Sequence, residues 1–442
     1  MADVPRAVHD DERVHEAVTC LGCGCACDDL TVVTRGGRLV EARGACALGE
    51  AWFADGTSTG VARVRGADAP VAAALDEAAR LLAGASRALV YLAPGLSCEA
   101  QRAAVALADH LRAGLDTITS DTARGAILAA QERGRAGATL GEVRRRADVI
   151  VYWGLDPDVR YPRFAERYGH RAPADALPAG QVRTVIAVDV DEARGPAAAT
   201  HRVAVPAAAE VAVLTATAAL LGGASPPPAS GAAGEAWPRA AALAGLIRAG
   251  RYVAVVADAE PAAGRDAGRA AALVALSQAL NGPTRGALVT LRAGGNRSGA
   301  DSVLTSQTGY PMAVDFAHGA PRYRPHDGTA RACLERGEAD AVLVAGDLGQ
   351  LPPDVATALA RAAVIAIGPH ASAAAGGPRA VAIDSGMAGV HEAGTALRAD
   401  DIPLPLRALV DGPRGAADLL RELGDRLAEL GEIAGPPGVT AR

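Results

Sequence analysis

Short apolar runs alternate with helix-like segments along most of the chain from about residue 70. Residues 88–93, ALVYLA, have the length and continuous apolar character of a buried strand, and residues 97–114 have apolar positions at helical spacing. Later apolar runs of strand length are residues 147–154, 183–190, 251–258, 286–293, 339–347 and 362–369. Strands that alternate with helices form parallel sheets covered on both faces. The pattern therefore predicts an α/β protein.

The N-terminal part of the chain has a different pattern. Residues 30–44, LTVVTRGGRLVEARG, alternate apolar and polar positions around Gly36 and Gly37, which is typical of a β-hairpin. A Pro-, Ser- and Gly-rich stretch at residues 222–235 interrupts the later alternation and indicates a linker or an exposed loop. Residues 415–430 have apolar positions at helical spacing and predict a closing helix.

With 442 residues the chain is too long for one hydrophobic core. We predict two doubly wound units, each with a parallel sheet, and a small Cys-rich domain before them. The expected division is 1–65 for a Cys-rich N-terminal β domain of iron-sulfur type, 66–221 for the first α/β domain, 222–235 for the linker or exposed loop, 236–384 for the second α/β domain, and 385–442 for a C-terminal segment with the closing helix.

Composition and charge exclude two classes of protein. Hydrophobic residues make up 50% of the chain but aromatic residues only 3%, so Ala, Val and Leu fill the core, as in helices packed on sheets. A formal net charge of -6 with both signs interspersed leaves no basic stripe for nucleic acid. No uncharged apolar run reaches the roughly 18 residues of a membrane span, and the acidic N-terminus lacks the apolar segment of a secretory signal. We expect a cytoplasmic protein with neither nucleic-acid nor membrane partners.

Clustered cysteines are the main candidate chemistry. Cys20, Cys23 and Cys27 form a C-x2-C-x3-C pattern, and Cys46 returns beyond the predicted hairpin. In a reducing compartment such a cluster indicates metal ligands before disulfides. Three thiolates from a Gly-rich loop and a fourth from a distant segment can enclose a [4Fe-4S] cluster. Cys25 also permits a C-x2-C-x-C pattern for zinc, and free thiols left by a lost metal are the third interpretation.

The segment CLGCGCACDDLTVV, with Cys46 in GACALGEAWF, resembles the N-terminus of the B subunit of formylmethanofuran dehydrogenases. In that family this cysteine pattern holds a [4Fe-4S] cluster. The likeness continues in the same order over most of residues 18–407, for example in LGEVRRRADVIVYWGLDPDVRYPRFAERYG and SGMAGVHEAGTALRADDIPLPLR. The resemblance implies a molybdopterin-oxidoreductase-like fold, of the formate dehydrogenase or DMSO reductase type, with two doubly wound parallel-sheet units.

Active members of the family hold molybdenum or tungsten with two pterin dithiolenes and a Cys that precedes His-Gly-Pro. The matching stretch here is residues 116–131, DTITSDTARGAILAAQ, which places Thr122 at the ligand position and lacks both the Cys and the His. A hydroxyl is a weaker donor than a thiolate, so the resemblance implies that the bis-pterin metal is absent. Ser120 and Asp121 stay open as alternative oxygen ligands, and helix N-capping is the simpler interpretation of Asp121 and Thr122.

A second motif agrees with the loss of the cofactor. Residues 153–157, WGLDP, resemble the family's WG-x-NP loop, which contacts a pterin nucleotide. The resemblance makes Trp153, Gly154, Asp156 and Pro157 part of a vestigial pterin cleft. Asp156 replaces the family's amide, and its carboxylate would repel a pyrophosphate. An ordinary turn at the end of a strand is the alternative.

Other candidates are weaker. Residues 293–300, AGGNRSGA, follow a predicted strand, but match neither the GxGxxG nor the P-loop pattern. His318, Arg322 and Arg324 would face the cofactor in an active homologue, and loop packing is the alternative. Cys98 follows a strand at the place where doubly wound folds bind ligands, or it is simply a small residue that opens a helix.

The joint absence of the Cys and the His is similar to the B subunit of the bacterial formyltransferase/hydrolase complex. The resemblance implies a non-redox subunit in one-carbon oxidation, from formaldehyde to formate, through tetrahydromethanopterin and a methanofuran analogue. It implies an amidohydrolase-like A subunit and a formyltransferase subunit as partners, and a chain without its own active site. The alternatives are a redox-active molybdenum or tungsten B subunit and an iron-sulfur electron-relay subunit.

Overall fold

The structure is a computed structural model that describes residues 11–56, 60–173, 177, 180–225, 231–261, 267–375 and 380–434. These residues divide into two compact units. Unit 1 comprises the described parts of Met1–Asp121, Gly294–Arg398 and Pro403–Arg442, and unit 2 those of Thr122–Ala293 and Ala399–Ile402. Within the described ranges, no helix is long and apolar enough to cross a membrane.

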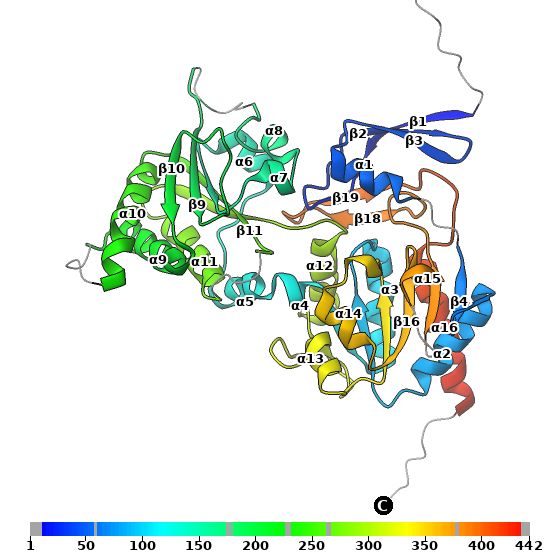
Figure 1. Ribbon diagram of the computed structural model, residues 1–442. Coiled ribbons are helices and arrows are strands. Elements are labelled where there is room, and N and C mark those ends of the chain that lie inside the picture. Colours follow the sequence, from blue (N-terminus) through cyan, green and yellow to red (C-terminus); the bar gives the residue numbers. More distant parts are fainter. Residues whose placement is uncertain are drawn as a thin grey trace, which may run out of the picture. The chain divides into compact units, whose positions relative to one another are not determined.

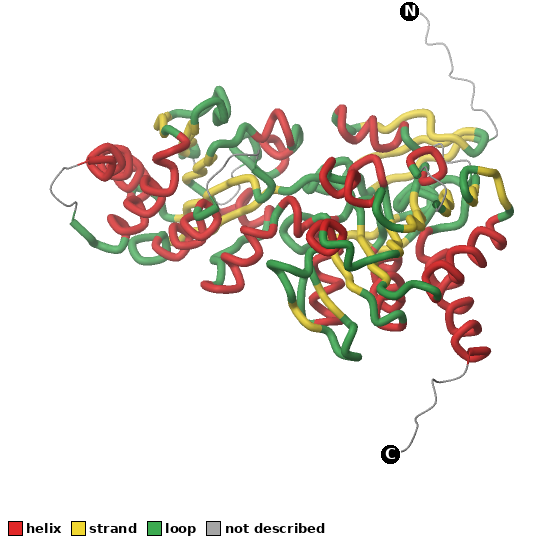
Figure 2. Tube along the Cα trace, turned by 60° about the horizontal axis from the view of Figure 1, so that its bottom comes forward, coloured by secondary structure: helices red, strands yellow, loops and turns green. Residues whose placement is uncertain are grey.

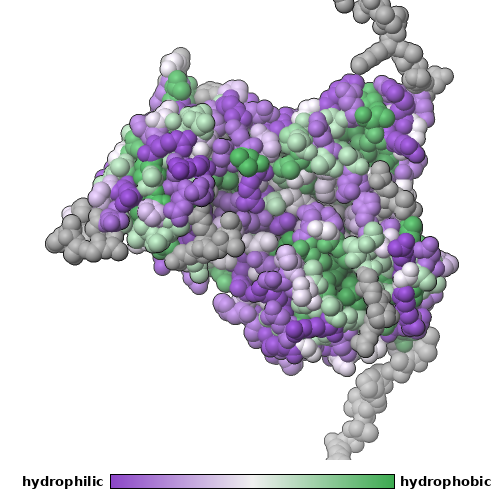
Figure 3. All heavy atoms as spheres, in the orientation of Figure 1, coloured by the Kyte–Doolittle hydropathy of each residue, from purple (hydrophilic) through white to green (hydrophobic). Residues whose placement is uncertain are grey.

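Unit 1 begins with an antiparallel sheet of order β1-β2-β3 (Figure 1). Its elements are β1 (Glu12–Val18), β2 (Leu30–Arg35) and β3 (Arg38–Arg43), followed by α1 (Ala47–Ala54). Gly36 and Gly37 connect β2 to β3 with φ angles of 57° and 71°, which a tight hairpin turn requires. The predicted hairpin is confirmed. Hydrophobic residues reach the surface over this part of the chain (Figure 3).

The main sheet of unit 1 has the order β14-β13-β7-β6-β15-β16-β17-β4-β5, and its strands from β7 to β17 are parallel. The central strands are apolar throughout because both faces are covered. The strands are β4 (Ala62–Val64), β5 (Ala67–Ala69), β6 (Ala88–Leu92), β7 (Gly114–Thr117), β13 (Val314–Asp315), β14 (Arg322–Tyr323), β15 (Ala341–Ala345), β16 (Ala363–Gly368) and β17 (Val381–Asp384).

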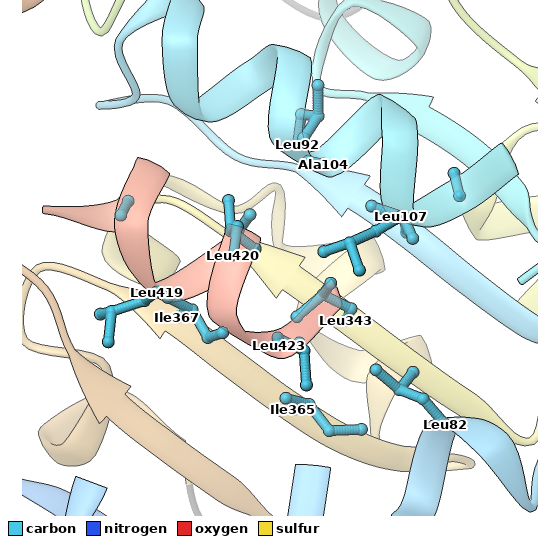
Figure 4. Packing of buried hydrophobic residues seen from close by; sticks show 14 of the residues in the cluster. Leu82, Leu92, Ala104, Leu107, Leu343, Ile365, Ile367, Leu419, Leu420 and Leu423 are labelled. Carbon is cyan, nitrogen blue, oxygen red and sulfur yellow. The ribbon is translucent and has the colours of Figure 1, made fainter. Parts of the chain in front are cut away.

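Helices pack on both faces of this sheet. On one face lie α2 (Val71–Ala83), α3 (Cys98–His110), α12 (Arg297–Thr308) and α16 (Ala416–Ala434), and on the other α13 (Ala330–Glu335) and α14 (Pro353–Leu359). Leu420 and Leu423 of α16, the predicted closing helix, insert between α3 and the strands (Figure 4). The remaining elements of unit 1 are α4 (Thr119–Thr122), which ends on the first residue of unit 2, η2 (Leu348–Gln350), α15 (Ala371–Ala374), β18 (Gly394–Leu397) and β19 (Pro403–Leu406).

Unit 2 contains a second parallel sheet, of order β10-β9-β8-β11-β12, whose strands are flanked by helices (Figure 2). The strands are β8 (Val149–Trp153), β9 (Thr184–Val190), β10 (His201–Val205), β11 (Tyr252–Asp258) and β12 (Arg285–Leu291). The helices are α5 (Arg124–Arg133), α6 (Leu140–Arg146), α7 (Pro157–Arg160), α8 (Phe164–Arg167), η1 (Ala207–Ala209), α9 (Glu210–Leu221), α10 (Gly231–Arg248) and α11 (Arg269–Ala279).

The two units do not follow the consecutive division expected from the sequence. Strand β6, expected in the first α/β domain, pairs in parallel with β15, expected in the second. The pattern of apolar runs identifies strands but not their partners, so it missed that the chain leaves unit 1 after α4 and later returns. The expected linker at residues 222–235 also differs, because residues 231–235 belong to α10 within unit 2, and residues 226–230 lie outside the described residues.

Candidate functional site

The Cys-rich loop of unit 1 packs at the point where its main sheet reverses its direction of winding. From β6 the chain continues to β7 on one side, while β15 lies on the other, and ligands bind at such switch points in doubly wound folds. The Gly295 N–H donates to the Leu21 carbonyl at 2.9 Å, and the Gly95 N–H donates to the Gly295 carbonyl at 2.8 Å. The Cys-rich loop, the Gly-rich loop and the end of β6 are therefore in direct contact.

Close packing against α1 shapes the Cys-rich loop. The Cys20 N–H donates to the Cys27 carbonyl at 2.8 Å, which closes the loop on itself. A Cβ on Gly22 would lie 2.6 Å from the Leu48 carbonyl oxygen, so only glycine fits there. A Cβ on Gly49 would lie 3.2 Å from the Cys20 sulfur, which places this face of α1 beside the thiol.

The thiols of the Cys-rich loop are electrostatic neighbours. Burial, together with the nearby thiols of Cys23, Cys27 and Cys46, raises the pKa of Cys20 to about 12, although a hydrogen bond from the Gly22 N–H lowers it. A hydrogen bond from Cys25 lowers the pKa of Cys23. Cys46 is the N-cap residue of α1 and is partly exposed, whereas the other four thiols are buried.

These residues fit an iron-sulfur cluster in their donor chemistry. Four thiols from two segments supply the ligand type that such clusters need. The indole N–H of Trp52, on α1, is buried without a hydrogen-bond partner among the described residues, and its ring packs against the apolar cluster that includes Leu21. A sulfur atom of an iron-sulfur cluster would accept a hydrogen bond from such an N–H. Within the described part of the chain, no three His, Cys, Asp or Glu side chains are grouped as ligands of one metal ion.

Polar side chains on β7 and directly after it form hydrogen bonds within the protein. Asp116 is fully buried and accepts hydrogen bonds from the Ser120 hydroxyl at 2.5 Å and from the Ala330 N–H at 2.6 Å. Burial raises the pKa of Asp116 to about 7. Asp121 accepts a hydrogen bond from the Tyr91 hydroxyl at 3.1 Å. The candidate oxygen ligands Ser120 and Asp121 thus have protein partners.

Thr122 is the last residue of α4 and the first residue of unit 2. It lines a cavity in unit 2. The expectation that Asp121 or Thr122 caps the next helix is wrong, because the N-cap of α5 is Ala123, and no side chain caps it.

The WGLDP segment forms the end of β8 and the start of α7. Asp156 is the N-cap of α7, and its carboxylate accepts from the Asp158 N–H at 3.0 Å. Gly154 has a φ of 56°, and Pro157 begins the helix. This geometry is that of a capped turn at a strand end, the alternative to a pterin contact.

Ion pairs cover the switch point of the sheet in unit 2, between β8 and β11. The Trp153 indole N–H donates to Glu210 at 2.9 Å, and the Arg269 guanidinium pairs with the same carboxylate at 2.9 Å. Arg160, at the end of α7, pairs with Asp258 at the end of β11. The chain's own side chains therefore satisfy the charges at this edge.

Comparison with known proteins gives the family. No protein-family model matches the chain. It is 32% identical over 436 residues to the B subunit of the tungsten-containing formylmethanofuran dehydrogenase 2 of Methanocaldococcus jannaschii, with 95% of this chain and 99% of the relative covered. The chain belongs to the family of formylmethanofuran dehydrogenase B subunits. The protein of the same name from Methanococcus maripaludis is 28% identical, with 95% of this chain and all of the relative covered.

A solved structure has the same mixed α/β fold as this B-subunit family member. It is a chain of the formyltransferase/hydrolase complex FhcABCD of Methylorubrum extorquens, in complex with methylofuran. The TM-score is 0.71 and the identity is 27%, with 84% of this chain and 99% of that chain covered. The predicted family resemblance is confirmed.

The Gly-rich loop, Cys98 and Arg324, which are weaker candidates for a site, make contacts within the protein itself. A Cβ on Gly294 would lie 2.2 Å from the Leu21 oxygen, so the Gly-rich loop approaches protein backbone. Cys98 opens α3 as a buried residue, and its sulfur lies 3.6 Å from the Asn296 amide nitrogen. Arg324 pairs with Asp315 and Asp327, while His318 and Arg322 are exposed.

Sequence reasoning missed the buried groups that hold these sites together. Glu210 begins α9 without any motif, and Tyr91 lies inside an apolar strand. Asp116 had one available signal, because it is a charged residue at the end of a predicted strand. For Trp52 the sequence carried no signal of a role beyond its position six residues after Cys46.

Proposed function

We propose that the chain is a structural B subunit, without redox chemistry, of a formyltransferase/hydrolase complex. That complex serves the oxidation of formaldehyde to formate through tetrahydromethanopterin and a methanofuran analogue. The proposed partners are an amidohydrolase-like A subunit and a formyltransferase subunit. In this proposal the fold is that of molybdopterin oxidoreductases, and the old pterin cleft has no catalytic role.

The observation that carries the proposal is the pair Thr122 and Ala123, at the positions where active family members have Cys and His. A threonine hydroxyl is a poor ligand for a metal that must cycle electrons. The adjacent carboxylate, Asp121, already accepts a hydrogen bond from the Tyr91 hydroxyl. The ion pairs of Arg160 and Arg269 support the proposal, because they neutralise the edge where a nucleotide would bind.

We further propose that Cys20, Cys23, Cys27 and Cys46 hold a [4Fe-4S] cluster with a structural role. Support comes from the mutual proximity of the four thiols and from the unpaired indole N–H of Trp52. When bound, the cluster would cross-link the Cys-rich loop to the start of α1. The protein's own contribution is to bury the sulfur ligands and to donate hydrogen bonds toward them.

Assay of the purified complex tests the non-redox role. With the formylated carrier as substrate, we expect release of formate without reduction of a viologen dye. A matched sample of a tungsten-containing relative serves as the positive control for dye reduction. Carrier-dependent dye reduction by this complex would contradict the proposal.

A second candidate is a redox-active molybdenum or tungsten subunit with Asp121 as the oxygen ligand. It is favoured by the tungsten-containing relatives at 32% and 28% identity. If Asp121 is the metal ligand, the complex should reduce the dye and Asp121→Ala should abolish that reduction. If the subunit is structural, Asp121→Ala should leave formate release unchanged.

A third candidate is an iron-sulfur subunit that only relays electrons. The partial exposure of Cys46 favours it, because electrons leave a cluster most readily at its solvent-facing ligand. An oxygen-free preparation without iron would exclude this candidate.

A further inference from the structure

A small cavity of unit 2 is lined on one side by Thr122, the candidate ligand position, and extends beyond it between helices and a strand that the sites above do not include. Its volume is 170 Å³, and it lies between α5, α11 and the edge strand β12. Ala126, Ala270, Leu273, Val274 and Leu288 form its apolar walls. Gly125 of α5 faces α11, where a Cβ would lie 3.9 Å from the Cβ of Ala270, an ordinary van der Waals contact.

Three charged side chains line the cavity, and two of them are neutralised. Asp258 pairs with Arg160, and Arg269 pairs with Glu210 at 2.9 Å. The third, Arg135, does not share in either of these pairs.

Arg135 is the group that remains open to an anion. It donates a hydrogen bond to the Thr290 hydroxyl at 2.7 Å. Asp401 interacts with it electrostatically, but Asp401 is shared with Arg292 and is not part of the cavity lining. Among the residues that the structure describes, the hydrogen bond of the Arg135 side chain goes to a hydroxyl and not to a carboxylate.

We infer that this cavity binds a small carboxylate with an apolar body. Arg135 and the Thr290 hydroxyl would hold the carboxylate, and the walls of α5, α11 and β12 would enclose the body. An apolar cavity of about 150 Å³ accepts benzene, so the body has the size of about one six-membered ring. A pterin dinucleotide is far too large for this volume.

The chemistry of the lining decides the charge of the ligand. A guanidinium pairs with a carboxylate through two parallel hydrogen bonds, which gives both energy and orientation. A cationic ligand of the same shape would face Arg135 and be repelled. A neutral ligand would fill the apolar part but leave the guanidinium without its strongest partner.

Titration of the full-length chain with benzoate tests the inference, with benzyl alcohol and benzylamine as neutral and cationic controls of similar shape. We expect saturable binding of one benzoate, with a Kd of about 0.1 to 1 mM, given the limits on affinity for so few atoms. Benzyl alcohol should bind more weakly and benzylamine least. No saturable binding of benzoate, or equal binding of benzylamine, would overturn the inference.

Variants locate the binding. Arg135→Gln should weaken benzoate about tenfold, the value of one charge-assisted hydrogen bond, and leave benzyl alcohol unchanged. Ala270→Phe should fill the cavity and abolish both ligands, and Thr290→Val offers a milder change that keeps the volume. Arg133→Gln, which changes an exposed arginine at the end of α5 outside the lining, is the matched control. Undiminished benzoate binding by both Arg135→Gln and Thr290→Val would refute this site.

Discussion

At the scale of single residues, the buried carboxyl of Asp116 has the most clearly defined environment. It lies on β7 and accepts hydrogen bonds from Ser120, Ala313 and Ala330. These donors stabilise the charged form, but burial dominates and raises the pKa to about 7, from 3.8. A group with a raised carboxyl pKa binds its proton more tightly in the folded state than in the unfolded chain.

Asp116 should therefore make the protein less stable as pH rises. The free energy of unfolding falls between pH about 4 and pH about 7, by about 4 kcal/mol at most for this group, and is flat outside that window. Asp116→Asn should remove this slope, although it also lowers stability by losing one acceptor. Melting temperatures between pH 5 and pH 7.5 measure the difference. Parallel pH profiles for the two proteins would contradict the assigned pKa.

The thiols give a second prediction at this scale. Cys20→Ser should reduce iron from about four atoms per chain to near none, because the cluster loses a buried ligand. Cys333→Ser, which changes a buried thiol on α13 far along the sequence, should keep the iron. Iron and sulfide analysis of oxygen-free preparations measures both variants. Equal iron in the two would show that Cys20 is not a ligand.

At the scale of elements, glycines decide how closely the loops meet. Gly295 and Gly309 both have positive φ, at 78° and 86°. A Cβ on Gly295 would lie 2.4 Å from Pro94, whereas a Cβ on Gly309 would meet nothing within 4 Å. The two positions therefore separate backbone strain from crowding.

Gly309→Ala should cost about 1 kcal/mol of unfolding free energy, the strain of a left-handed alanine. Gly295→Ala should cost about 2 kcal/mol more, because the end of β6 must move. Denaturant titration compares the two variants. If the two variants lose the same unfolding free energy, the Gly-rich loop and the end of β6 do not pack as closely as the structure shows.

The buried pair of Glu210 on α9 and Arg269 on α11 is a second link between elements. Glu210→Ala should cost about 3 to 5 kcal/mol, because it leaves the arginine charge buried and the Trp153 indole without an acceptor. Glu335→Ala, which removes an exposed pair with Arg331, should cost below about 1 kcal/mol. Denaturant titration compares the two variants, and Trp153 fluorescence reports on the buried site. Similar losses of unfolding free energy in the two variants would argue against a pair of Glu210 and Arg269 that is shielded from water.

At the scale of the whole molecule, the sequence predicted the elements better than their assembly. Apolar runs identified β6, β8, β9, β11, β12, β15 and β16, and the closing helix, since burial on both faces leaves a continuous signal. Strand order was not predictable, because β6 and β15 pair across more than half of the chain. The discontinuous unit 1 follows from that pairing and explains the misplaced domain boundaries.

The candidate site was predictable where spacing carries chemistry. The pattern of Cys20, Cys23 and Cys27 with Cys46 led to four neighbouring thiols. The ion pairs at the end of β8 and β11 were not predictable. Glu210 and Asp258 are not part of any sequence motif, and only the fold places their arginine partners beside them. The same holds for the cavity around Arg135, which needs the packing of α5 on α11.

Metal and cofactor analysis of the complex, purified without oxygen from cells supplied with tungstate and molybdate, distinguishes a structural B subunit from a redox-active one. For the structural subunit we expect iron at about four atoms per chain, neither tungsten nor molybdenum above background, and no pterin in a denatured extract. Tungsten or molybdenum at about one atom per chain, together with pterin, would contradict it.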